Sequence, residues 1–70
     1  MHPESMIAAR KVLGLTQAEL AQILDVNTRT PSRWETGVTP IPTVVSLLIV
    51  SALMSADVRR LLGIKQKDEG

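Results

Sequence analysis

Arg29 and Arg33 are the side chains best suited to binding chemistry, because they are the only positive charges between Leu15 and Gly37. They lie four residues apart, a spacing that places both on one face of a helix. The guanidinium fork can donate two parallel hydrogen bonds to O6 and N7 of guanine, and one such contact discriminates between bases by roughly 1–3 kcal/mol. The two arginines are therefore candidates for contacts with base edges.

The remaining polar residues do not have the spacing of a catalytic or metal site. Glu19, Glu35 and Asp57 do not form an acid–base pair, and Ser32 has no histidine near it in the sequence. His2 is the only histidine and cysteine is absent, which argues against a metal site. We expect no enzymatic activity, no metal and no cofactor.

Length and composition indicate one small globular domain. The chain has 70 residues, near the lower limit for a hydrophobic core that folds unaided, and 44% of them are apolar. The net charge is only +1, so contacts with an anionic ligand would depend on geometry and backbone donors as well as on charge. The amino terminus lacks a secretory signal, and the apolar stretch 44–54 is shorter than the roughly 20 residues that span a bilayer. We expect a cytoplasmic protein that does not enter the membrane.

Capping signals and turn residues divide the chain into five predicted helices, at about 3–13, 16–24, 28–36, 43–54 and 55–62. Thr16 and Glu19 form a capping box, Asn27 or Thr28 can cap the third helix, and Pro31 should distort the first turn of that helix. The β-branched residues of 44–50 leave a strand there as an alternative. The prediction is an all-α, compact four- to five-helix bundle: one domain over 1–64, followed by a flexible polar tail over 65–70.

The segment 16–37 has the features of a helix-turn-helix, two short helices joined by a tight turn. Ala21 is small enough for a close helix crossing, and Asp25 can adopt the positive φ that the turn requires. Val26 should fill the angle between the helices, while Leu20 and Trp34 anchor the second helix from beneath. The second helix can then present its outer face to a major groove.

Two sequence segments at this separation resemble one known family. Leu15-Thr16-Gln17-Ala18-Glu19-Leu20-Ala21-Gln22, followed by Ser32-Arg33-Trp34-Glu35-Thr36-Gly37, is similar to the Cro/C1-type (XRE-type) helix-turn-helix family of phage repressors, bacterial transcriptional regulators and antitoxins. The resemblance implies a lambda-repressor-like DNA-binding fold. This sequence departs from the family pattern at Asp25, where glycine is usual, and at Pro31, where an aliphatic residue is usual.

The resemblance also implies roles for individual residues. It implies base contacts from Thr28, Arg29 and Arg33, and phosphate contacts from Gln17, Asn27 and Thr36, with Thr30 and Ser32 as neighbours in reach of DNA. Arg10 and Glu35 match a pair that forms an internal salt bridge. Independently of the resemblance, the amides at the start of the 16–24 helix, together with Gln17, can form a phosphate cradle.

The helix expected over 43–54 is apolar on all sides, and a 70-residue monomer has few elements to cover it. We expect one face, with Val44, Leu47 and Leu48, to meet the helix-turn-helix, and a second face to form a homodimer interface, with Val45, Ile49, Leu53 and Met54. Alternatively, the last helix and the amino-terminal segment cover this second face.

These observations favour a sequence-specific regulator of transcription, in particular a repressor, that binds double-stranded DNA as a homodimer at a palindromic operator. The rival hypothesis is a protein-interaction module, such as an antitoxin-like subunit whose apolar 43–54 helix binds a partner protein. The near-zero net charge and that apolar helix favour the rival.

Overall fold

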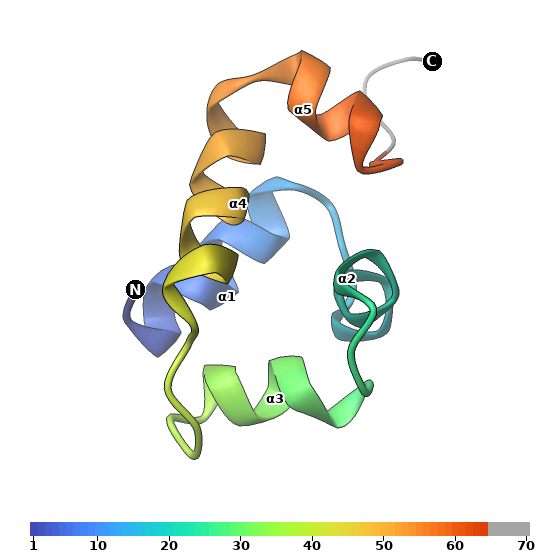
Figure 1. Ribbon diagram of the computed structural model, residues 1–70. Coiled ribbons are helices and arrows are strands. Elements are labelled where there is room, and N and C mark those ends of the chain that lie inside the picture. Colours follow the sequence, from blue (N-terminus) through green and yellow to red (C-terminus); the bar gives the residue numbers. More distant parts are fainter. Residues whose placement is uncertain (65–70) are drawn as a thin grey trace.

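The computed structural model describes residues 1–64, which form five helices and no strand (Figure 1). Their bounds are α1 Pro3–Val12, α2 Gln17–Leu24, α3 Arg29–Glu35, α4 Thr43–Met54 and α5 Ala56–Leu61. The prediction of a small helical bundle is confirmed, and the strand alternative for 44–50 is wrong. The tail predicted over 65–70 lies outside the described residues.

Local capping explains where the helices begin. The hydroxyl of Thr16 accepts from the amide of Glu19 (3.1 Å), and the Glu19 carboxylate accepts from the amide of Thr16 (2.8 Å), so the predicted capping box at α2 is present. Ser55 caps α5 by accepting from the amide of Val58 (3.3 Å). These side chains satisfy amides that have no partner within a helix.

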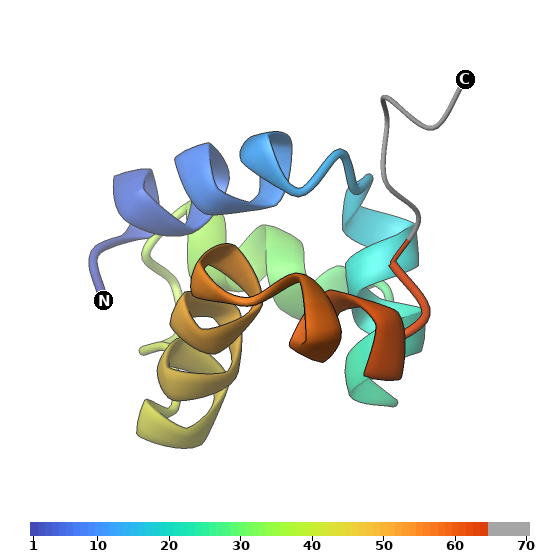
Figure 2. The ribbon, with the colours of Figure 1, turned by 90° about the horizontal axis from the view of Figure 1, so that it is seen from above.

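The helices pack as two groups around one core. In Figure 1, α3 lies at the bottom, between α2 on the right and the α4 side on the left, and α4 leads up to α5 at the top. Figure 2 shows the same helices from above. Contacts join α1 to both α3 and α4, α2 to α3, and α4 to α5. Helix α1 therefore connects the α2–α3 unit with the α4–α5 unit.

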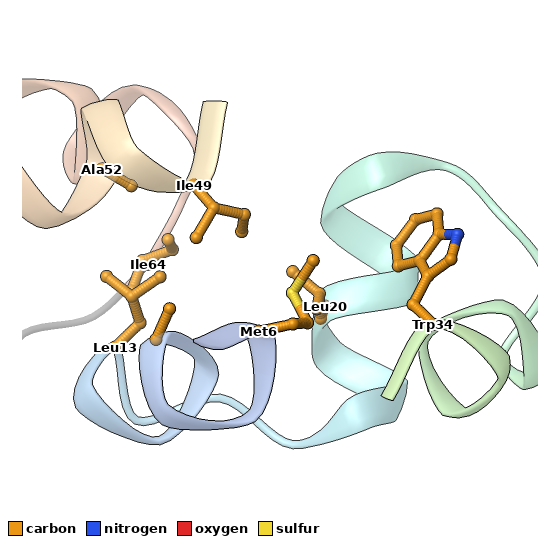
Figure 3. Close-up of a cluster of buried hydrophobic side chains, with 8 residues drawn as sticks. Met6, Leu13, Leu20, Trp34, Ile49, Ala52 and Ile64 are labelled. Carbon is orange, nitrogen blue, oxygen red and sulfur yellow. The ribbon is translucent and has the colours of Figure 1, made fainter. Parts of the chain in front are cut away.

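The core draws one or two side chains from nearly every element (Figure 3). Its buried residues are Met6, Ala9, Leu13, Leu20, Trp34, Ile49, Ala52 and Ile64. The prediction that Leu20 and Trp34 are core anchors is confirmed, since both are buried. Ile64, the last apolar residue before the polar 65–70 segment, follows α5 and packs in the same cluster.

Two packing predictions are wrong. Ile49 is only 2% exposed, and Val45 and Leu53 are half-buried against the same core, so these three residues do not form a free dimerisation face. The exposed side holds Val44, Leu47 and Met54. Val44 and Leu47 therefore do not meet the helix-turn-helix as expected, and only Met54 belongs to the predicted interface. Because α4 is apolar all around, its sequence contains no polar face that would show which side is buried.

The packing of Val26 at the helix-turn-helix also differs from the prediction. Val26 is 36% exposed and therefore does not fill the space between α2 and α3 as expected. Pro31, on α3, is fully buried instead.

Candidate nucleic-acid interface

The turn between α2 and α3 is built around Asp25, which has a left-handed backbone (φ 56°, ψ 48°). The amide of Val26 donates to the carbonyl of Ala21 (3.0 Å), and that of Asp25 donates to the carbonyl of Gln22 (3.3 Å). This pair of hydrogen bonds is the Schellman motif, in which the left-handed position is usually glycine. Asp25 thus occupies the positive-φ position that the sequence predicts.

Asn27 starts the third helix. Its side-chain Oδ1 accepts from the amide of Arg29 (2.9 Å), and its carbonyl accepts from the amide of Thr30 (2.9 Å). Thr28 makes no side-chain cap. Of the two predicted capping residues, Asn27 therefore supplies the hydrogen bond.

Pro31 is accommodated because it is the third residue of α3. The first amides of a helix have no intrahelical acceptor, so the missing N–H breaks no helical hydrogen bond. The ring is fully buried, as an aliphatic core residue would be, and the helix continues to Glu35. Pro31 and Trp34 together fix the inner face of α3.

The outer face of α3 carries the two arginines. Arg29, Arg33 and Thr36 follow one another at spacings of four and three residues, and all three are exposed. Thr28 and Asn27 are exposed at the amino-terminal end of this face, while Thr30 and Ser32 are half-buried at its sides. Asn27, Arg29, Thr30 and Arg33 line a shallow depression. Neither arginine forms an ion pair with another residue of 1–64.

Glu35 is the centre of a polar network behind this face. Its carboxylate accepts from Nε of Arg10 (2.7 Å), from Nη2 of Arg10 (3.2 Å) and from Nε2 of Gln17 (2.9 Å). Nη1 of Arg10 donates to the carbonyl of Leu15 (2.9 Å). The side chains of Arg10 and Glu35 are 14% and 5% exposed. The network connects α1, the α1–α2 loop, the start of α2 and the end of α3.

This network sets the charge state of Glu35. Burial raises the pKa of the carboxyl, but hydrogen bonds from Arg10 and Gln17 and the charges of Arg10 and Lys11 lower it. The lowering effects outweigh burial, so the pKa lies below its ordinary value of 4.5. Glu35 is therefore ionised at neutral pH and has a structural role.

Three of the predicted phosphate-contact residues are already engaged within the protein. Gln17 donates to Glu35, Asn27 caps α3, and the Thr36 hydroxyl donates to the carbonyl of Ser32 (2.9 Å). The Gln17–Glu35 contact was not expected from the sequence. Pairs of residues 18 apart on two different helices leave no periodic signal.

Within residues 1–64, no group of three or more histidine, cysteine, aspartate or glutamate residues could hold a metal ion. No helix in this part of the chain has the length and apolar character needed to cross a membrane.

Comparison with known proteins identifies the architecture. A family model described as helix-turn-helix matches residues 6–54, from within α1 to the end of α4. No curated protein and no solved structure matches the chain. The matched segment contains the capping box, the Asp25 turn and α3 with its exposed arginines. Since the model covers most of the chain, this protein belongs to the Cro/C1-type helix-turn-helix family.

Proposed function

We propose that the protein is a sequence-specific, duplex DNA-binding transcriptional regulator, acting as a repressor, that reads the major groove with α3. The observation that carries this proposal is the two-sided character of α3. Pro31 and Trp34 are buried on one side, while Arg29 and Arg33 are exposed on the other and unpaired within residues 1–64. Exposed guanidinium groups on a rigidly packed helix are suited to base-edge recognition.

The size of α3 is compatible with this role. A helix of 7 residues is about 10 Å long, and the major groove is about 12 Å wide. In this proposal Thr28, Arg29 and Arg33 contact bases. Thr30, Ser32, Asn27 and Thr36 lie along the edges of the same face, where phosphates would pass. The first amides of α2, beside Gln17, provide further donors for a phosphate.

Selection from a random duplex library, followed by binding titrations on the selected sequence, tests the proposal. Arg33→Ala should weaken binding to the selected duplex about 5- to 150-fold and relax discrimination at one base pair. Arg60→Ala is the matched control, since Arg60 is an exposed arginine on α5, away from α3 (Figure 1). If both variants bind as the wild type does, or no duplex is selected, DNA reading by α3 is wrong.

We also propose that the protein binds DNA as a homodimer at a palindromic operator through the exposed face of α4. Val44, Leu47, Ser51 and Met54 are exposed and follow spacings of three, four and three residues. This is the a/d pattern of a two-helix seam. Leu47 is 63% exposed and Met54 82% exposed, although the opposite side of the helix is buried through Ile49 and Ala52.

A second copy of α4 is the occupant that this face favours. Charged residues that flank a helix seam select one partner over another, and α4 contains none in its 12 residues. The face therefore carries no charge that would repel an identical copy. A dimer that reads a palindromic operator needs its two α3 helices about 34 Å apart, the spacing of successive major grooves on one side of DNA.

Leu47→Glu tests the interface by sedimentation at micromolar concentration. The wild type should sediment as a dimer and Leu47→Glu as a monomer with unchanged helix content. Leu61→Glu, which changes an exposed leucine on α5, should remain dimeric. A monomeric wild type would contradict the homodimer. In that case the uncovered α4 face would favour the antitoxin-like alternative, in which it binds a different protein.

A further inference from the structure

Helix α3 is joined to α2 at both of its ends. At its start, the turn at Asp25 connects the two helices covalently. At its end, Glu35 accepts a hydrogen bond from Gln17, the first residue of α2 (2.9 Å). Rotation of α3 relative to α2 would have to break this second connection. Figure 1 shows α3 running from the α2 side of the molecule towards α4, so any change in its angle would move the outer face.

We propose that Gln17 is a positioning residue for DNA recognition: its hydrogen bond to Glu35 fixes the angle of α3, and thereby the register of Arg29 and Arg33 on the bases. This inference rests on the proposed function. It differs from the phosphate contact that the family resemblance implies for Gln17, because the side chain here acts through α3 and not directly on DNA.

The surroundings of Glu35 explain why Gln17 can have this effect. Arg10 already holds the carboxylate against α1 through two hydrogen bonds, at 2.7 and 3.2 Å. The Glu35 carboxylate therefore has a defined position, and the Gln17 side chain that donates to it is held in place as well. Arg33 lies two residues before Glu35 on the same short helix, so a tilt at Glu35 is transmitted to Arg33. Gln17 is half-buried, which favours a defined side-chain position.

The two roles of Gln17 predict different binding behaviour. Loss of a phosphate contact weakens binding to all duplexes by the same factor, since phosphates contain no sequence information. Loss of positioning weakens binding to the selected sequence, but not to unrelated DNA. The ratio of specific to non-specific affinity therefore separates the roles.

Gln17→Met is the variant of choice, because it keeps the length of the side chain and removes the donor. We expect the ratio of specific to non-specific affinity to fall on the order of tenfold, the size of one lost base contact. Gln22→Met is the matched control, since Gln22 is an exposed glutamine on the same helix, and it should leave the ratio unchanged. Gln17→Lys restores a donor to Glu35 and should return the ratio towards the wild-type value, even if it raises binding to all DNA.

A double-mutant cycle with Arg33→Ala provides the second readout. If Gln17 acts by positioning Arg33, Gln17→Met should have little further effect once Arg33 is absent; independent contacts would give additive losses. An unchanged affinity ratio together with additive losses overturns the positioning role and leaves DNA binding intact. A wild-type protein that selects no duplex overturns the proposed function itself. If Gln17→Met does not fold, Gln17→Lys tests the proposal in its place. A fall in the ratio of specific to non-specific affinity as large as that of Arg33→Ala contradicts the proposal.

Discussion

Nε of Arg10 lies 2.7 Å from Oε2 of Glu35, so the last residue of α3 is held against α1 across 25 residues of sequence. The carboxylate also binds Gln17, and therefore a single side chain connects three helices. A buried ion pair stabilises a fold only modestly compared with apolar packing, but removal of one partner leaves the other charge without compensation. The network should accordingly be sensitive to substitution at its centre.

Glu35→Ala should destabilise the protein by about 3 kcal/mol, because it leaves the Arg10 guanidinium largely buried and without its carboxylate partner. In a domain of this size each kcal/mol lowers Tm by roughly 4–8 °C. Thermal unfolding followed by circular dichroism measures the change. Glu4→Ala, which removes an exposed carboxylate from the first turn of α1, is the control and should lower Tm only slightly. Equal melting temperatures for Glu35→Ala and the wild type would contradict a stabilising network.

The same network predicts a loss of stability in acid. The pKa of Glu35 is lower in the folded protein than its ordinary value of 4.5, so the unfolded chain binds a proton more readily than the folded one. The resulting stabilisation is complete above pH 4.5 and is lost as the pH falls through the lower, folded-state pKa. Arg10 and Lys11 are the positive charges that face the carboxylate. Urea unfolding at pH 7 and pH 3 should show a smaller loss for Glu35→Gln than for the wild type; an identical loss would assign the acid sensitivity to other carboxylates.

One substitution at Asp25 should raise the stability of the protein. A left-handed backbone is unfavourable by roughly 1–2 kcal/mol for most L-residues, less for aspartate, and glycine avoids this strain. Glycine also loses more chain entropy on folding, which offsets part of this gain. Asp25→Gly should therefore stabilise the protein by about 0.5 kcal/mol. Asp25→Ala should destabilise it by about 1 kcal/mol, since alanine retains the strain and lacks a polar side chain. Urea midpoints for the two variants should lie on opposite sides of the wild type, and a more stable alanine variant would contradict the argument.

Much of this fold could be predicted because its helix ends are encoded locally. Thr16 and Glu19 form the capping box that their spacing indicates, and Asp25 adopts the positive φ expected at the turn. Pro31 is compatible with α3 because a proline in the first turn removes no helical hydrogen bond. Each of these features depends on residues within a few positions of one another.

The features that could not be predicted depend on contacts between distant residues. The buried side of α4 is determined by which of its apolar residues meet α1 and α5, and both sides of the helix are mainly apolar. The hydrogen bond between Gln17 and Glu35 depends on the crossing of α2 and α3, which sequence periodicity does not specify. The DNA-contact roles of Arg29 and Arg33 remain predictions, although the structure leaves both side chains exposed.

Arg59 shows how α4 ends without a glycine and provides a last prediction. Its Nη1 donates to the carbonyl of Ala52 (2.7 Å) and more weakly to that of Leu53 (3.4 Å), two carbonyls in the last turn of α4. A positive charge at this end also interacts favourably with the helix dipole. Arg59→Ala should destabilise the protein by about 1.5 kcal/mol, the value of a hydrogen bond from a charged donor. Arg60→Ala removes an exposed arginine whose only ion pair within residues 1–64 is a surface contact with Asp57, and it should change stability by less than about 0.5 kcal/mol. Chemical unfolding of the two variants compares these effects directly, and similar losses in both would show that the α4 carbonyls are satisfied equally well by water.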